Sequence, residues 1–312
     1  MKAAEERRYA ASFTASAPIR PNASGVSSLC YFGFAMSQGY FRAAFACVLI
    51  LSAPTLAAAQ GGPPGKAESW TFSAGVAPFF APIYSGADDY GLSLYPDLRV
   101  AYGDRFFASV PEGIGYRVIN TRYLKAGPIA RIRFGRESGT GGSPFLIAGE
   151  TDDLDGFSDV SAAGEFGGFV EFGGRYFSTR AELRRGVGGH EGLVADVSAS
   201  YSFRSGSTGF SMGPRATLAG EDFIGVYYGV DQSAASASGL AAYDPGGGVV
   251  SYGAGATLIR PLTDRLSLAV IAGYDRIAGD AARSPLVRAR GDADQISLIV
   301  AFSWRFGVAP SR

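Results

Sequence analysis

Hydrophobic and polar residues alternate along two long stretches of the chain. From Gln295 to Phe306, every even position is Ile, Leu, Val, Phe or Trp, whereas most odd positions are small or polar. The stretch from Leu193 to Arg204 alternates in the same way, with its apolar residues at odd positions. Strands of soluble proteins average five or six residues, but a tilted strand needs about ten to cross a bilayer. The alternation therefore predicts transmembrane β-strands with one lipid-facing side.

The same alternation recurs at ten further places, which brings the expected number of strands to twelve. An even number suits a closed bacterial barrel, in which no strand edge is left unpaired. We therefore predict an all-β chain whose residues 70–306 form a closed antiparallel transmembrane β-barrel, with ten strands as the alternative number. The segment 106–118 keeps one phase throughout and is interpreted as a single strand. The ten further segments are 70–76, 94–102, 106–118, 127–135, 165–173, 175–184, 209–218, 223–230, 249–259 and 265–275.

Charged side chains occur on the side of these strands that is opposite to the apolar side. A charge that faces lipid near the bilayer midplane is costly, whereas charges inside a narrow barrel can pair across the lumen. We therefore expect the lumen to be lined with paired acids and arginines. The expected inward set is Asp97, Arg99, Arg131, Arg133, Arg180, Glu182, Arg184, Asp196 and Arg215.

Loop lengths indicate which end of the barrel faces outward, because outer-membrane barrels have short periplasmic turns and long external loops. Near the carboxyl end, segments 231–247 and 276–293 are long and 260–264 is tight, as expected. In the middle the rule fails: 136–164 is long where a short turn is expected, and Gly173-Gly174 is short where an outer loop is expected. The number of strands is therefore open by one hairpin.

The amino-terminal residues have the pattern of a secretory signal peptide at 36–59. Met36 begins a short segment with one positive charge, an apolar run follows, and Ala57-Ala58-Ala59 fits the small-residue cleavage rule. Residues 1–35 are interpreted as a misplaced or extended start, 60–69 as a short periplasmic segment, and 307–312 as a tail. Cleavage after Ala59 would remove Cys30 and Cys47, so we expect no disulfide or cysteine metal site in the mature protein.

Composition narrows the possible classes of protein. The chain holds 44 Gly, 22 Phe and 16 Tyr but one His, and 18% of its residues are charged, against about 25% in an average soluble domain. It is too apolar and aromatic to be disordered. The formal net charge is zero, so no overall basic character favours nucleic acid as a partner. These features agree with a barrel whose surface meets lipid.

Three sets of residues could carry chemistry. His190, the only histidine, could act as a general base oriented by Glu191 or Asp196, but no serine occurs between Ser178 and Ser198, and we interpret it as a histidine in a glycine-rich turn. Acids in the outer loops could bind Ca²⁺ or simply be solvated; they are Asp88, Asp89, Asp152, Asp153, Asp155 and Asp159. Arginines around the last outer loop could bind lipopolysaccharide phosphates, although nearby acids could neutralise them; they are Arg276, Arg283, Arg288 and Arg290. We assign no catalytic, metal or cofactor site, and expect no cofactor.

Several segments in order resemble the outer-membrane family of the MltA-interacting protein MipA and of OmpV. The resemblance covers about residues 70–306, and the chain differs in that GVAPSR follows Phe306, whereas members tend to end on an aromatic residue. The segments are YSGADDY (84–90), YGDRFF (102–107), GPIARIRFGR (127–136), RAELRRGVGGHEGLVAD (180–196), GEDFIGVYYGV (220–230), SASGLAAYDPGGG (236–248) and AGDAARSPLVRARGDADQIS (278–297).

The resemblance implies a non-enzymatic barrel in the outer membrane of a Gram-negative bacterium, in contact with outer-membrane lipid and lipopolysaccharide. It also implies a scaffold for peptidoglycan (murein) remodelling, with a lytic transglycosylase and a penicillin-binding protein as partners and no nucleic acid. Two alternatives stay open: a small channel or solute-responsive porin-like barrel, since inward charges could line a pore, and a lipid- or peptide-hydrolysing barrel centred on His190.

Overall fold

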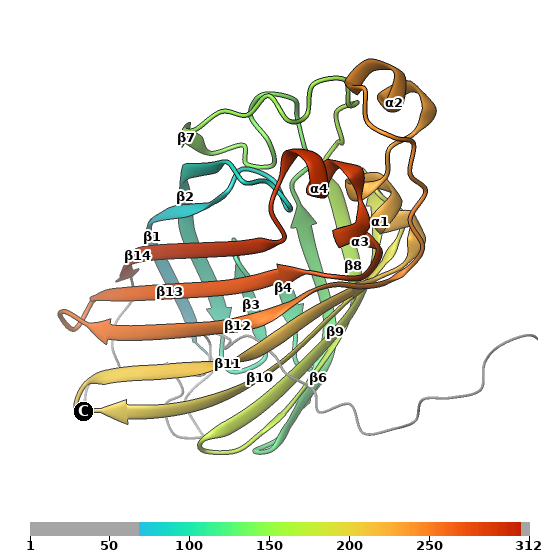
Figure 1. Ribbon diagram of the computed structural model, residues 1–312. Coiled ribbons are helices and arrows are strands. Elements are labelled where there is room, and N and C mark those ends of the chain that lie inside the picture. Colours follow the sequence, from blue (N-terminus) through green and yellow to red (C-terminus); the bar gives the residue numbers. More distant parts are fainter. Residues whose placement is uncertain (1–68, 307–312) are drawn as a thin grey trace, which may run out of the picture. The chain divides into compact units, whose positions relative to one another are not determined.

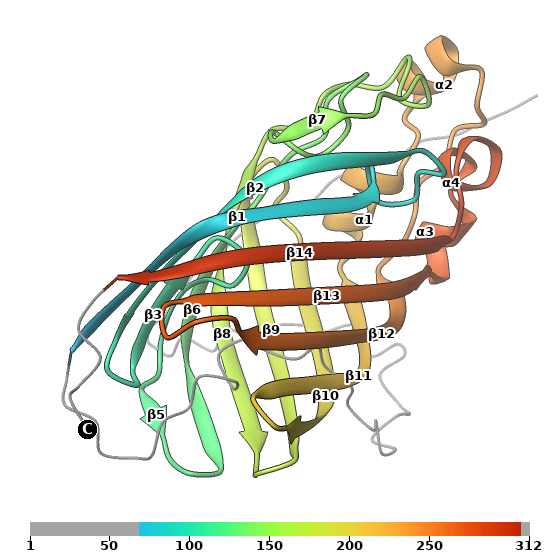
Figure 2. The same cartoon turned by 90° about the vertical axis from the view of Figure 1, so that its left-hand side faces the viewer.

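A computed structural model describes residues 69–306, which form a closed antiparallel β-barrel (Figures 1 and 2). The first strand closes the ring, because β1 pairs with β2 on one side and with β14 on the other. The strands are β1 (Trp70–Pro82), β2 (Tyr90–Tyr102), β3 (Phe106–Ser109), β4 (Gly113–Tyr116), β5 (Ile119–Asn120), β6 (Leu124–Arg133), β7 (Leu146–Ala148), β8 (Ala163–Gly173), β9 (Phe177–Gly188), β10 (Leu193–Ser205), β11 (Thr208–Ala219), β12 (Gly248–Pro261), β13 (Leu266–Ile277) and β14 (Asp294–Phe306).

The ring contains twelve strands, as the alternation predicts. Its order is β1, β2, β3, β4, β6 and then β8 to β14. β5 pairs with β6 below β4, and β7 pairs with β2 in an outer loop, so neither adds a member to the ring. The predicted barrel over residues 70–306 is confirmed, and the alternative of ten strands is wrong.

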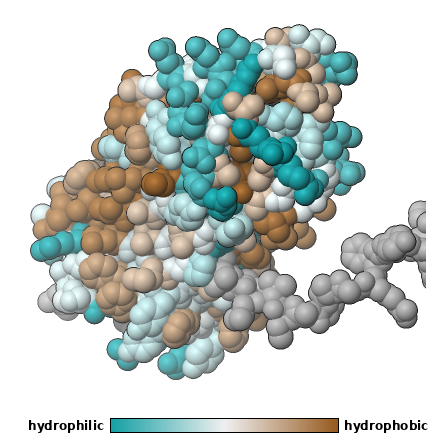
Figure 3. Space-filling model, in the orientation of Figure 1, coloured by the Kyte–Doolittle hydropathy of each residue, from teal (hydrophilic) through white to brown (hydrophobic). Residues whose placement is uncertain are grey.

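The alternation of the sequence becomes two faces of the barrel wall. On β14, the even-numbered Ile296, Phe302 and Trp304 are exposed on the outside, whereas the odd-numbered Gln295 and Ala301 are buried. Figure 3 shows hydrophobic surface over the strands and hydrophilic surface gathered at the end that carries the helices. The apolar outer face can contact lipid in place of water. The backbone N–H and C=O groups of each strand form hydrogen bonds with the neighbouring strands, so none has to be satisfied by lipid. A barrel of this kind is located in the outer membrane of a Gram-negative bacterium.

The segment 106–118 is a hairpin, so its interpretation as one strand is wrong. β3 and β4 run antiparallel, with Phe106 opposite Tyr116 and Ser109 opposite Gly113. Each paired position joins residues of the same parity, so the alternation continues in phase through the three-residue turn 110–112. Gly113, whose φ of 80° lies in the left-handed region, leads out of that turn.

The predicted strand 223–230 is helical instead. Helix α1 (Glu221–Tyr228) has two acids in its first turn, which suit the positive end of a helix. Its buried residues are Phe223, Ile224 and Tyr228, a spacing that places them on one face of a helix. The two errors compensate: the hairpin adds one strand to the ring and the helix removes one.

These two corrections restore the order of long and short loops. Segment 134–162 now lies at the same end as the loops that carry α1, α2 (Gln232–Ser238), α3 (Gly279–Arg283) and α4 (Pro285–Arg290), and Gly173-Gly174 lies at the opposite end. The end with the long loops therefore faces outward, and the short turns face the periplasm. None of the helices between residues 69 and 306 has the length and apolarity needed to span a bilayer.

The ladder of strand pairing is incomplete on one side of the wall. The pairing of β2 with β3 ends at Arg99, and that of β4 with β6 ends at Ala130. On the outer side of these points, residues 95–97 of β2 and 131–133 of β6 have no strand between them. We call this part of the wall the β2/β6 seam. The outer loop 134–162 covers it: Leu94 donates to the carbonyl of Phe145, and the rings of Tyr95, Phe134 and Phe145 lie 4.9 to 6.1 Å apart.

The expectations for the two ends of the chain lie outside the described residues. These are the extended start at 1–35, the signal peptide at 36–59, the periplasmic segment at 60–69 up to residue 68, and the tail at 307–312.

Candidate functional site

The largest concentration of charge inside the barrel is centred on Arg184. Its side chain is 1% exposed, and its guanidinium group contacts three acids, two of which lie on the neighbouring strands. Nε donates to Glu165 on β8 at 2.8 Å, Nη2 donates to Asp196 on β10 at 2.5 Å, and Nη1 donates to Glu182 on β9 itself. An arginine offers five donors in a fixed geometry, which suits it to join several carboxylates at once.

The network extends along the lumen through acids that each accept from two or more cations. Glu182 also accepts from Arg131 at 2.8 Å and from Arg180 at 2.7 Å. Glu171 accepts from Lys125 at 2.9 Å and from Arg180 at 3.3 Å. Because a buried charge is tolerated only when it is paired, this arrangement explains how charges occupy the lumen.

All nine residues of the expected inward set lie on strand positions that face the lumen, and each of them forms an ion pair. Arg133 contacts Glu165, Arg99 contacts Asp97 at 2.8 Å, and Arg215 contacts Asp275 on β13. A side chain at Gly273 would lie 2.3 Å from Nη2 of Arg215, so glycine makes room for this guanidinium group. The expected inward set lacks Glu165, Glu171 and Lys125, although Glu165 and Glu171 occupy the odd, inward positions of their predicted strand.

His190 lies at the outer end of the network and is buried. Its Nε2 is 3.1 Å from Oε1 of Glu165, and its ring packs edge-on against Phe223 of α1. The partner that orients it is therefore Glu165, and neither Glu191 nor Asp196 takes that place. A Cβ at Gly186 would lie 2.3 Å from Nδ1 of His190, so the imidazole fills the space that this glycine leaves.

Helix α1 covers the outer mouth above this network. Phe223 stacks with the guanidinium group of Arg133, whose Cζ is 5.0 Å from the ring centroid. The same face of the helix joins the largest apolar cluster, which contains Phe223, Ile224, Tyr228 and residues of β10, β12, β13, α3 and α4. Gly192 permits the close approach, because a Cβ there would lie 2.4 Å from the backbone nitrogen of Phe223. The helix is thus fixed to the barrel through its buried face.

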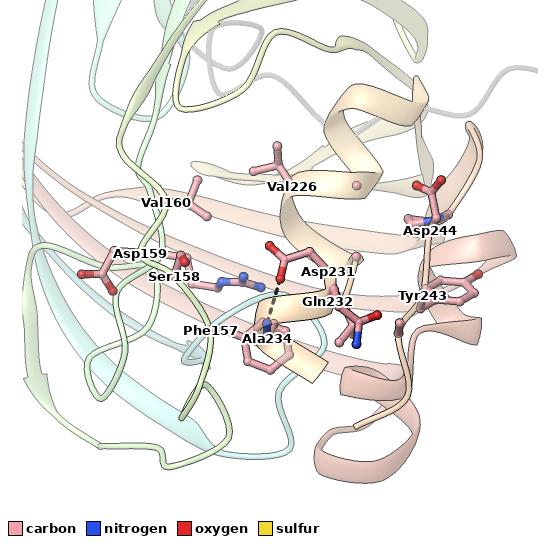
Figure 4. A pocket seen from close by; sticks show the side chains of 16 residues that line it. Phe157, Ser158, Asp159, Val160, Val226, Asp231, Gln232, Ala234, Tyr243 and Asp244 are labelled. Carbon is pink, nitrogen blue, oxygen red and sulfur yellow. Dashed lines mark hydrogen bonds between the residues drawn. The ribbon is translucent and has the colours of Figure 1, made fainter. Parts of the chain in front are cut away.

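Two pockets lie beside α1 in the outer loops. The first, shown in Figure 4, has a volume of about 690 Å³ and is lined by loop 134–162 on one side and by α1 and α2 on the other. In it, Arg136 donates to the carbonyl of Tyr227 at 2.7 Å, and burial lowers the pKa of its guanidinium group. The second has a volume of about 820 Å³ and is lined by His190 and by four acids, Glu191, Glu221, Asp222 and Asp244.

Three of the acids considered for Ca²⁺ come together. Ligand atoms of Asp88, Asp89 and Asp153 lie within 4.8 Å of one another. Burial raises the pKa of Asp153, and the charges of the other two acids raise it further. Tyr84 donates to Asp153 at 3.2 Å, and burial raises the pKa of this tyrosine as well. Asp152, Asp155 and Asp159 do not belong to the group, and Asp159 instead lines the first pocket.

The four arginines considered for lipopolysaccharide are largely engaged within the loops. Arg276 contacts Asp294 at 2.6 Å, and Arg283 contacts Asp280. Arg290 donates to the carbonyls of Asp153 and Ser238 at 2.8 and 2.5 Å, and so ties α4 to two other loops. Arg288 is exposed. The nearby acids thus neutralise two of the four guanidinium groups.

Comparison with known proteins gives the following likenesses. No curated protein sequence matches the chain. Among solved structures, the COG4313 outer membrane channel from Pseudomonas putida F1 is 13% identical over 79% of this chain and all of that one, with a TM-score of 0.42. The NanC porin is 9% identical over 76% of this chain and 99% of the porin chain, with a TM-score of 0.35. OmpT, an outer membrane protein of Vibrio cholerae, is 7% identical over 76% of this chain and 97% of the OmpT chain, with a TM-score of 0.33.

A family model matches the chain over nearly all of the described residues. The model described as MltA-interacting protein MipA matches residues 74–306. This range contains residues 74–82 of β1, every later strand of the ring, and the outer loops with their helices. The segments that carry the resemblance, from 84–90 to 278–297, all lie within it. The chain therefore belongs to the MipA family of outer-membrane β-barrel proteins.

Proposed function

We propose that this barrel is a non-enzymatic scaffold that holds peptidoglycan-remodelling enzymes at the periplasmic face of the outer membrane. The observation that carries the proposal is the family match over residues 74–306, because that family is described by an interaction with the protein MltA. A lytic transglycosylase and a bifunctional penicillin-binding protein are the proposed partners. The fold offers them the periplasmic turns.

The lumen supports a structural role for its charged groups. A general base must reach the proton that it removes, but His190 is 2% exposed and lies beneath Phe223. Glu165 is 1% exposed and accepts from Arg133, Arg184 and His190. These contacts use the groups to hold strands together, which favours a scaffold over a hydrolase.

Reconstitution tests the scaffold directly. The barrel would be placed in nanodiscs and mixed with a purified lytic transglycosylase and a bifunctional penicillin-binding protein from the same envelope. We expect each enzyme to bind alone and the two together to form a ternary complex by size-exclusion chromatography. Empty nanodiscs are the control. Failure of both enzymes to bind would overturn the proposal, and crosslinking in cells followed by mass spectrometry would check that the same contacts occur there.

A narrow channel is the second candidate, favoured by the pocket of about 820 Å³ at the outer mouth and its four acids. These acids would concentrate cations there. Planar-bilayer recording distinguishes the two functions. Stable conductance steps that change in Arg131→Gln, whose side chain is 30% exposed to the lumen, would support transport. A silent bilayer with correctly folded protein would count against it.

A further inference from the structure

Most of the exposed charged residues at the periplasmic end of the barrel are basic. Among the described residues in and beside the short turns, seven arginines are exposed, against two acids, Asp104 and Asp264. We call the arginines the arginine rim: Arg105, Arg122, Arg175, Arg204, Arg260, Arg265 and Arg305.

The outer end has the opposite composition. Its exposed charged residues, within the described part of the chain, comprise thirteen acids and four arginines. Since the whole chain has a formal net charge of zero, the rim reflects where charges are placed and not a basic composition. The acids are Asp88, Asp89, Glu137, Glu150, Asp152, Asp155, Asp159, Glu191, Glu221, Asp222, Asp231, Asp244 and Asp292; the arginines are Arg185, Arg276, Arg283 and Arg288.

The positions of the rim arginines favour a partner in the periplasm over lipid headgroups. Arg305 lies between the lipid-facing Trp304 and Phe306, and Arg204 follows the lipid-facing Phe203, so both point to the interior side at the mouth. Lipid headgroups surround the outside of the barrel and do not reach this side. Arg122 and Arg175 lie in the turns themselves, where each stacks on the following tyrosine, with Cζ 5.2 and 5.1 Å from the ring centroids.

The chemistry of arginine identifies the kind of ligand. Its planar guanidinium group binds carboxylates in a bidentate manner and stays charged at any physiological pH. The exposed guanidinium groups lie at separate positions around the mouth and suit a partner that presents many carboxylates at intervals. Each single ion pair is weak, but several formed at once add up to firm binding. The polymer that lies directly beneath an outer membrane is peptidoglycan, whose stem peptides carry free carboxylates.

We propose that the arginine rim binds the stem-peptide carboxylates of peptidoglycan directly and so holds the barrel against the murein layer. The inference rests on the proposed function in placing the barrel beside murein, and deepens it by giving the scaffold a contact with the polymer itself. No enzyme takes part in this contact. A failure here therefore leaves the enzyme-binding test of the scaffold unaffected, and the reverse also holds.

Co-sedimentation with isolated sacculi tests the proposal. Protein expressed from the full chain would be purified from outer membranes in a zwitterionic detergent and mixed with protein-free sacculi. We expect it to sediment with them at low salt, and the apparent affinity to fall about tenfold on raising the salt to a few hundred millimolar, because exposed charges are then screened. Sacculi whose carboxylates have been amidated should lose most of the binding.

A pair of matched variants separates the rim from net charge. The first replaces the turn arginines by Gln: Arg105→Gln, Arg122→Gln, Arg175→Gln and Arg265→Gln. The control makes the same change in total charge at the outer end: Arg185→Gln, Arg276→Gln, Arg283→Gln and Arg288→Gln. Heat-dependent migration on gels verifies that both variants fold. We expect the rim variant to lose about tenfold in affinity for sacculi, and the control to stay within about twofold of the parent protein.

Three results would overturn the proposal. The first is equal binding of the rim variant and the parent protein to sacculi. The second is undiminished binding to amidated sacculi, since carboxylates would then not be the ligand. The third is a rim variant that co-purifies with less phosphatidylglycerol, counted by mass spectrometry of its lipid extract, while it binds sacculi normally. That result would assign the arginines to anionic lipid headgroups.

Discussion

The two sides of the barrel wall are built in different ways. From β8 to β13, long neighbouring strands pair along most of their length, and ion pairs centred on Arg184 join β8, β9 and β10 inside the lumen. Between β2 and β6, the short hairpin of β3 and β4 fills only the periplasmic half of the wall, and a loop covers the β2/β6 seam. The difference shows that one side is stabilised by buried charge and strand pairing, the other by loop packing.

The largest effect should come from removing the centre of the network. Arg184→Met would leave Glu165, Glu182 and Asp196 without their shared partner in a buried site, and we expect a loss of about 3–5 kcal/mol in the free energy of unfolding. Urea unfolding followed by heat-dependent migration on gels measures it. Arg185→Met is the matched control, because the adjacent side chain is exposed, and it should change stability by less than about 0.5 kcal/mol. Equal stability of the two variants would contradict the role given to the network.

A smaller effect is expected from crowding the same side of the barrel. Gly273→Ala would place a Cβ against Arg215 and 2.7 Å from Oγ of Ser297, and overpacking of this kind costs about 1–3 kcal/mol. Gly209→Ala on β11 is the control, since the nearest atom to a Cβ there is 3.9 Å away. In the same unfolding experiment, the free energy of unfolding of this control should be close to that of the parent protein. A tolerated Gly273→Ala would mean that Arg215 is free to move.

The seam should be visible in backbone dynamics. Amides that lack a paired strand on one side open more easily, so residues 131–133 of β6 should exchange hydrogen at least about tenfold faster than residues 125–130 of the same strand. Hydrogen exchange read by mass spectrometry resolves the two segments. Uniform protection along β6 would show that loop 134–162 closes the wall as tightly as a strand.

The smallest effect concerns pH and the loop that covers the seam. Burial raises the pKa of Asp153, so its ionised form is less favourable in the docked loop than in an open one. Docking should therefore be strongest below the ordinary pKa of 3.8 and should weaken as the pH rises through the raised value. Exchange rates of residues 150–156, corrected for the intrinsic effect of pH, measure this. Asp153→Asn should remove the dependence, and the same pH profile in that variant would exclude Asp153 as its cause.

Alternation predicted the regular side of the wall and misread the irregular one for a physical reason. A hairpin whose turn has three residues preserves parity, so the outward positions Phe106 and Tyr116 stay in phase although the chain has reversed direction. The signals that distinguish a hairpin here are Pro111 and Gly113, since proline is excluded from central strands and glycine supplies the left-handed turn. Both lie in the middle of a stretch that is otherwise long enough to span the membrane.

The site was predictable in its positions but not in its partners. Parity alone placed Arg184 and Glu182 inside, because both lie at even positions of β9, where most of the odd positions are exposed. Which acid meets which arginine depends on strand register across β8 and β10, and register is set by loops that periodicity does not describe. The helix α1 was misread because Phe223 and Tyr227 also fit an alternating pattern, whereas the acids of its first turn and the spacing of Ile224 and Tyr228 indicate a helix.

The closure of the ring has a consequence for how the chain folds. Phe72 in the first strand pairs with Phe306 in the last, so the contact that removes the final pair of sheet edges joins opposite ends of the described chain. A contact of such sequence separation carries the largest loop-closure entropy and forms late. Until β14 has paired with β1, one edge of β1 is unpaired and can bind another strand. Folding therefore requires that this edge be guarded during assembly, and a chain that lacks β14 would aggregate through it.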